Sequence, residues 1–283
     1  MAVAVVTDST SDLDPQRAAA LGVSVVPLFV LWGAQSYRDN VDLTRAQFYE
    51  KLAAEPELPT TSQPSPQMFE DAFRPHAQAG DPILCVVISS KLSGTINAAR
   101  SAAAAFPQTR IEIVDSESAA GGLGMQAMRA AEVARAGGSL ESVLAAVERE
   151  KATQRLYACV PSLAHLVRTG RIGKARAAIG TLMKIVPVIS LRDGEVVAHA
   201  QVRTMSRARR MMIESTLENV RDVERARLLV MHTNAPDLAA SIVEELRAGL
   251  GGAQPRMLEV LEAGPVIATH AGPGAVGIFS STE

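Results

Sequence analysis

Four hydroxyl side chains crowd one short turn of this chain, inside the segment spanning residues 81–100. The apolar run at residues 83–88 predicts a buried strand, because uninterrupted β-branched residues suit a parallel sheet covered on both faces. The turn after it holds Gly94 and the hydroxyls of Ser89, Ser90, Ser93 and Thr95. A helix entered at Ser93 or Gly94 would direct unpaired N–H groups at an anionic headgroup. The same residues also fit an ordinary helix cap, which the turn alone favours.

Three other segments carry polar groups with a possible role in binding. His270 lies among glycines and prolines in residues 264–274, where the backbone can approach a ligand and the imidazole could donate a hydrogen bond. The run RTGRIGK at residues 168–174 fits either an anion site or a docking patch for an acidic partner, although such cations are usually just solvated. Prolines on both sides of residues 60–63, TTSQ, would hold those side chains still in an extended loop.

Several kinds of chemistry are disfavoured by the motifs. The five histidines form neither an HExxH nor an HxH pattern, so a metal site is not expected. The sequence has no GxSxG elbow, no GxxxxGK[ST] phosphate loop and no GxGxxG directly after a strand. Cys85 and Cys159 lie in apolar runs and are expected to be buried small hydrophobes rather than a disulfide or metal ligands.

Charge and hydropathy limit the partners and the location. A net charge of −2 over 283 residues argues against nucleic acid and leaves at most transient membrane contact. No basic segment precedes the first apolar run, and no apolar run is long enough to span a bilayer. The expectation is a soluble, cytoplasmic protein without a cofactor.

The elements that would position these groups begin with a β–α–β unit. Residues 2–6 predict a strand, residues 15–21 a helix capped by Asp12 or Asp14, and residues 23–31 a second strand. This order predicts an α/β fold with a parallel sheet, in which ligands lie beyond the carboxyl ends of strands.

The pattern changes near residue 156. Two apolar runs, residues 186–191 and 195–202, flank Arg192-Asp-Gly, a strong signal for an antiparallel hairpin. We therefore expect two α/β domains. Residues 1–155 would hold a mainly parallel sheet, and residues 156–283 a mixed or mostly antiparallel one.

Six motifs follow one another along the chain: VTDSTSDL at residues 6–13, TSQPSP at 61–66, ISSKLSGTINAA at 88–99, VDSESAAGGLG at 114–124, RTGRIGK at 168–174 and THAGPGAVGIF at 269–279. Together and in this order, they make the chain resemble the DegV family of bacterial fatty-acid-binding proteins. The chain departs from the family at Gly173 and Ala120, where a serine is frequent.

The resemblance implies a fatty acid in a buried tunnel between the two domains. Its carboxylate would be held by Thr61, Ser93 and His270, with Ser62, Gly94 and Thr95 beside them. Arg171 would take part in the interaction with a partner kinase, and Arg203 is a weaker candidate for the same role.

In function, the resemblance implies a non-enzymatic lipid carrier. It would present the fatty acid to the catalytic subunit of a separate ATP-dependent kinase for acyl-phosphate formation, and so serve phospholipid synthesis. One alternative is a stand-alone acyl hydrolase with Ser93 as nucleophile and His270 as base. A sugar- or nucleotide-binding protein ranks last.

Overall fold

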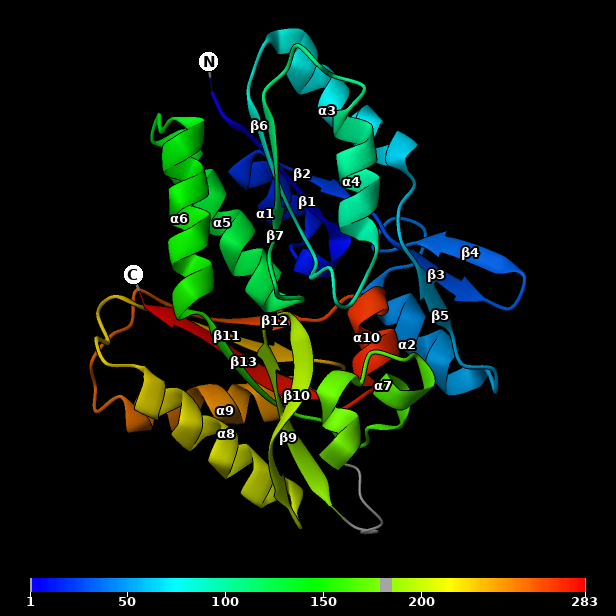
Figure 1. Cartoon of the computed structure of the whole chain (residues 1–283). Coiled ribbons are helices and arrows are strands. Elements are labelled where there is room, and N and C mark those ends of the chain that lie inside the picture. Colours follow the sequence, from blue (N-terminus) through cyan, green and yellow to red (C-terminus); the bar gives the residue numbers. More distant parts are fainter. Residues whose placement is uncertain (1, 179–184, 283) are drawn as a thin grey trace. The chain divides into compact units, whose positions relative to one another are not determined.

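The structure, a computed structural model, describes residues 2–178 and 185–282 (Figure 1). It divides into two compact units. Unit 1 comprises Met1–Ala152 and Gly264–Val266, and unit 2 comprises Thr153–Ala263 and Ile267–Glu283. The chain therefore leaves unit 1 after Ala152, returns for three residues, and then re-enters unit 2.

Unit 1 is built on a four-stranded parallel sheet with the order β2-β1-β6-β7. Its strands are β1 (Ala4–Asp8), β2 (Val23–Val26), β6 (Ile83–Val87) and β7 (Ile111–Asp115). Every residue of β1 and β6 is buried, as expected for central strands covered on both faces. The parallel sheet predicted for this part of the chain is confirmed.

Unit 1 also contains helices, and some of them pack against this sheet. They are η1 (Ser9–Ser11), α1 (Pro15–Leu21), α2 (Arg45–Ala54), α3 (Pro66–Ala79), α4 (Thr95–Ala103), α5 (Gly121–Arg135) and α6 (Leu140–Thr153). The cap of α1 is Asp14, whose side chain accepts from the Arg17 N–H at 2.9 Å. Phe69 and Phe73 of α3 are fully buried, and their rings lie 5.9 Å apart. This aromatic contact anchors α3 in the core of unit 1.

A small antiparallel sheet in unit 1 was not expected. It has the order β4-β3-β5, with β3 (Phe29–Trp32), β4 (Gln35–Arg38) and β5 (Thr60–Ser62). The single strand predicted for residues 23–31 is wrong, because the chain breaks between β2 and β3 at Pro27, which has no N–H for a sheet ladder. The extended loop predicted around Thr61 is instead a short strand.

Unit 2 contains a six-stranded sheet with the order β10-β9-β8-β13-β11-β12. Its strands are β8 (Arg155–Cys159), β9 (Val186–Arg192), β10 (Glu195–Val202), β11 (Ala226–His232), β12 (Met257–Glu262) and β13 (Val276–Thr282). Among these described strands only the β11–β12 pair is parallel, so the prediction of a mixed, mostly antiparallel sheet is confirmed. The hairpin β9–β10 turns at Asp193 and Gly194, both with positive φ, as a two-residue loop of this kind requires.

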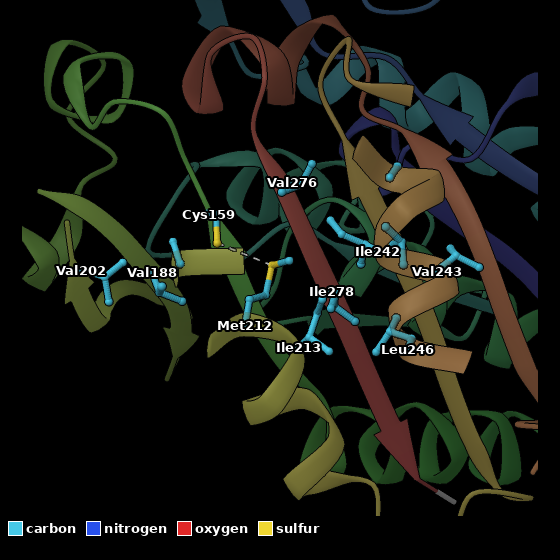
Figure 2. Close-up of a cluster of buried hydrophobic side chains, with 13 residues drawn as sticks. Cys159, Val188, Val202, Met212, Ile213, Ile242, Val243, Leu246, Val276 and Ile278 are labelled. Atoms are coloured by element: carbon cyan, nitrogen blue, oxygen red, sulfur yellow. Dashed lines mark hydrogen bonds between the residues drawn. The ribbon is translucent and has the colours of Figure 1, made fainter. Parts of the chain in front are cut away.

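The core of unit 2 lies between this sheet and two helices, α8 (Met205–Asn219) and α9 (Pro236–Gly249) (Figure 2). Met212 of α8, Ile242 of α9 and Ile278 of β13 are fully buried in it. The Cys159 sulfur lies 3.9 Å from the Met212 sulfur, and burial raises the pKa of the Cys159 thiol to about 12. Cys85 of β6 is also free and buried, so both cysteines pack as small hydrophobes, as predicted.

Short helices also contribute to unit 2: α7 (Ala164–Arg168), η2 (Gly173–Ala178) and α10 (Pro265–Ala271). The first two residues of α10 belong to unit 1 and the rest to unit 2. His270 therefore lies on a helix and not in the loop that its glycine and proline neighbours suggested.

Candidate functional site

The hydroxyl-rich turn of unit 1 connects β6 to α4. Gly94 is the N-cap of α4 and offers no side-chain cap. The Ser93 and Thr95 hydroxyl oxygens are 2.9 Å apart, and the Thr95 N–H donates to the Ser93 oxygen at 3.3 Å. Thr95 is buried, whereas Ser93 is only partly so. Ser93 thus supplies part of the cap, and its hydroxyl remains close enough to the surface to meet a ligand.

The segment containing Thr61 lies against this turn. Thr61 pairs with Val30 in the β3–β5 ladder, which fixes the direction of its side chain. The Gln63 side chain lies over Gly94, so closely that a Cβ at Gly94 would collide with the Gln63 carbonyl oxygen. Thr61, Ser62, Ser93, Gly94 and Thr95 thus belong to two neighbouring segments of unit 1 held together at Gln63. A side chain at Gly94 would displace the Gln63 amide.

The loop after β7 supports the same turn from the other side. The Asp115 carboxylate accepts from the Ser90 N–H at 3.3 Å and from the Glu117 N–H at 2.9 Å. The Ser89 N–H donates to the Ser118 carbonyl at 2.8 Å. Ser89 and Ser90 are therefore fixed through their backbones, and Ser90 keeps an exposed side chain.

Ala120, one of the two departures from the family pattern, precedes α5 with φ 53° and ψ −140°. A side chain at such a positive φ costs roughly 1–3 kcal/mol. We therefore expect Ala120→Gly to raise the free energy of unfolding by about 1 kcal/mol, after subtracting the entropy that glycine loses on folding. Urea denaturation would measure this gain. The matched change Ala119→Gly, at an adjacent buried residue without a positive φ, should instead lower stability.

In unit 2, His270 lies among cationic groups. Burial, together with the charges of Arg171, Arg168 and His165, lowers the pKa of His270 from its usual value of 6.5 to about 3. The imidazole is therefore neutral at physiological pH and can donate one hydrogen bond. A bound anion would offset the repulsion from the two arginines and raise this pKa. The surroundings of His270 consequently favour a negatively charged ligand.

His165 was missed from the sequence. Its ring packs against Gly272, where a Cβ would lie 2.6 Å from the His165 Cδ2 atom. Burial lowers the pKa of His165, while a hydrogen bond to the Thr269 backbone opposes that shift. The signal available was its spacing from Arg168, three residues later on one helical face. His165 thus supports α10 next to His270.

The two arginines assigned to partner binding occupy different parts of unit 2. Arg171 is partly buried, and its guanidinium donates to the Thr169 carbonyl. Arg203 is exposed between β10 and α8. Since Thr61 and Ser93 belong to unit 1 and His270 to unit 2, convergence of these three residues on one ligand stays a prediction.

The described residues offer neither a metal cluster nor a membrane span. No group of three or more histidine, cysteine, aspartate or glutamate side chains among residues 2–178 and 185–282 could hold a metal ion. Within the same ranges, every helix is too short or too polar to cross a membrane.

The fold and these segments define a class: a two-unit α/β protein in which the carboxyl end of a parallel sheet bears a hydroxyl-rich turn. A family model, described as an uncharacterised protein of the DegV family, matches residues 2–283. The chain belongs to the DegV family.

Known relatives are similar to this protein in sequence or in fold over nearly the whole chain. A DegV domain-containing protein of Deinococcus radiodurans is 40% identical over 280 residues, covering 98% of both chains. The structure of a DegV family protein from Thermus thermophilus, described with fatty acid binding, has a TM-score of 0.93 and 37% identity over 100% of both chains. DegV of Bacillus subtilis, described as a fatty acid binding protein, has a TM-score of 0.91 and 32% identity, again with 100% coverage of both.

Proposed function

We propose that this protein binds one long-chain fatty acid and holds its carboxylate with Thr61, Ser93 and His270. The observation that carries the proposal is the contact between the Thr61 and Ser93 segments at Gln63 and Gly94. Two hydroxyls on neighbouring segments suit the two oxygens of a carboxylate. The similarity to solved DegV proteins described as binding fatty acids supports this ligand class.

The imidazole of His270 complements those hydroxyls. Being neutral, it can donate one hydrogen bond to a carboxylate oxygen, and Arg168 and Arg171 supply positive charge nearby. Ser62, Gly94 and Thr95 would line the same headgroup region. The polar groups would orient the acid, whereas burial of the tail would supply most of the affinity.

Affinity should rise steeply with chain length. Each buried methylene contributes about 0.8 kcal/mol, so two further carbons should tighten binding about tenfold until the tail fills its space. Titration calorimetry with saturated acids of 12 to about 18 carbons would measure this slope. Methyl esters of the same lengths serve as the control, since they keep the tail but lose the charged headgroup. An affinity independent of length would contradict burial of the tail.

Native mass spectrometry of the purified protein would test the ligand class directly. We expect one bound fatty acid per chain, identified after extraction of the lipid that co-purifies. A protein that carries no lipid and gains none from added fatty acid would refute the proposal.

We further propose that the protein is a carrier that presents the carboxylate to a separate kinase, with Arg171 and Arg203 on the partner surface. Purified protein mixed with fatty acid and ATP should then form no acyl phosphate, and addition of the kinase catalytic subunit should start the reaction. Robust acyl-phosphate formation without a partner would refute the carrier role.

A further inference from the structure

Three aspartates outside the proposed headgroup site are buried in unit 1. Asp8 ends β1, Asp12 follows η1, and Asp39 follows β4, and each is at most 2% exposed. The charges of Asp8 and Asp39 both raise the pKa of Asp12, so the three carboxyl groups lie close enough to interact. Buried carboxyl groups are costly unless they are hydrogen-bonded, so their partners indicate their role.

Each of these carboxyl groups accepts from the backbone of a segment far away in the sequence. Asp8 accepts from the Ile88 N–H at 2.7 Å, at the start of the turn that carries Ser93. Asp12 accepts from the Gly264 N–H at 2.8 Å, directly before α10. Asp39 accepts from the Val266 N–H at 3.4 Å, in the first turn of α10. The cluster thus holds the starts of two segments that bear proposed headgroup residues.

The chain approaches this cluster closely at Gly264. A Cβ at Gly264 would lie 2.7 Å from the Asn40 amide nitrogen and 3.0 Å from the Asp12 Oδ1 atom. The Gly264–Val266 segment is therefore seated closely on the aspartates, and displacement of their oxygens would displace the backbone.

The charge balance around the cluster is unequal. Arg45 of α2 attracts Asp12 and Asp39, and its guanidinium donates to the Asp12 carbonyl at 3.0 Å. Burial raises the pKa of the Cys85 thiol on β6, and the charge of Asp8 raises it as well. The Asp12 Oδ2 atom is buried without a hydrogen-bond partner among the described residues. The charges of Asp8 and Asp39 repel that of Asp12, and the charge of Asp8 repels that of Asp39. Full ionisation would therefore add repulsion within the cluster, which the attraction of Arg45 opposes at Asp12 and Asp39.

We propose that Asp8, Asp12 and Asp39 are positioning residues that hold Ile88, Gly264 and Val266 in place for ligand binding, and that this hold weakens as the cluster gains negative charge. The expected effect on ligand binding rests on the proposed function. The hold of the three aspartates on the Ile88, Gly264 and Val266 amides can be measured without a ligand.

The direction of the pH effect follows from the folded-state pKa values. Burial raises the pKa of Asp8 to about 6, that of Asp39 to about 7, and that of Asp12 well above its usual range. A carboxyl group whose pKa is raised by folding stabilises the folded state when it is protonated. This stabilisation is complete at pH values below the ordinary aspartate pKa, and it is lost as the pH rises through the folded-state pKa. The hold should therefore weaken from about pH 4 through about pH 7, as Asp8 and Asp39 ionise.

Hydrogen exchange of the Ile88, Gly264 and Val266 amides in the ligand-free protein tests the hold. After correction for the intrinsic exchange rate, protection of Gly264 and Val266 should fall about tenfold between pH 5.5 and pH 7.5. Asp39→Asn, which cannot ionise, should flatten this dependence. The exposed Asp71→Asn on α3 is the matched control for loss of a carboxylate and should leave the dependence unchanged.

Two substitutions at Asp12 test whether its side chain acts as a hydrogen-bond acceptor or only fills space. Asp12→Asn keeps an oxygen for the Gly264 N–H and should retain protection close to wild type. Asp12→Ala removes the acceptor and should lower Gly264 protection by about tenfold or more. If Asp12→Ala does not fold, the pH series of wild type, Asp12→Asn and Asp39→Asn still decides the question.

Measurements of stearic acid affinity test whether the hold of the aspartates on the Gly264 backbone matters for ligand binding. We expect Asp12→Ala to weaken stearic acid affinity about tenfold, with Asp12→Asn restoring it. Unchanged affinity in Asp12→Ala despite lost Gly264 protection would overturn the positioning role, and so would pH-independent protection in wild type. Failure of wild type to bind any fatty acid would instead refute the proposed function and leave the exchange result standing.

Discussion

Ser93→Ala should weaken fatty-acid binding by roughly tenfold to a hundredfold, because a hydrogen bond to a charged group contributes about 1.5–3 kcal/mol. The Ser93 hydroxyl also caps the turn by accepting from the Thr95 N–H, so stability should fall by about 1 kcal/mol as well. Titration calorimetry gives the first effect and urea denaturation the second.

Ser90→Ala is the matched control for this change. Ser90 lies in the same turn, but its side chain is exposed and its backbone N–H is held by Asp115. Its loss should leave both fatty-acid affinity and stability near wild type. Equal effects of the two substitutions would contradict a headgroup role for Ser93.

The same Ser93 variant bears on the hydrolase alternative. Within the described part of unit 1, the Ser93 hydroxyl bonds to the Thr95 hydroxyl, which is no general base. We expect no ester turnover by the wild-type protein. Turnover that disappears in Ser93→Ala would favour a hydrolase over a carrier.

Gly173→Ala should destabilise the protein by about 3 kcal/mol, the sum of left-handed backbone strain and overpacking. Gly173 has φ 53°, and a Cβ there would lie 2.6 Å from the Val196 carbonyl oxygen and 3.1 Å from the Val196 nitrogen. Backbone atoms cannot move aside as a flexible side chain can, so the loop itself would shift. A serine at this position would meet the same obstacle.

Gly170→Ala, in the same loop, separates the two contributions. Gly170 has φ 74°, but no atom lies within 4 Å of the position that a Cβ would take, so alanine should cost only about 1 kcal/mol of strain. Urea denaturation of both variants gives the comparison. Equal losses would show that contact with Val196 contributes nothing.

Short-range sequence signals predict the secondary structure wherever one or two residues determine the backbone conformation. Asp193 and Gly194 predict the hairpin β9–β10, because both can adopt the positive φ that its turn needs. Asp14 and Pro15 predict the start of α1, because a cap and a first-turn proline act within four residues.

Other features depend on contacts distant in the sequence. Residues 23–31 read as one strand, but Pro27 divides the run between two sheets. The first part joins the parallel sheet by pairing with β1, and the second part joins the antiparallel sheet by pairing with β5. Residues 264–274 read as a loop, yet α10 forms there. Backbone N–H groups at its start bond to Asp12 and Asp39, more than 200 residues away in the chain.

The candidate site shows the same division. The motifs around Thr61, Ser93 and His270 carry the resemblance that implies an acid-binding headgroup site, whereas the hydroxyl-rich turn by itself favours an ordinary helix cap. The TDSTSD segment reads as a simple turn, and Asp39 carries no signal of its role, because nothing in a linear sequence tells a solvated aspartate from a buried one.

The sequence by itself therefore determined the family, the α/β class and the local turns, which rest on residue chemistry and neighbouring backbone preferences. Only the tertiary structure decided that Gln63 closes over Gly94, that cations surround His270, and that three aspartates share one buried cluster. These features arise from burial and proximity, which change the pKa and the hydrogen-bonding partners of a group without changing its identity.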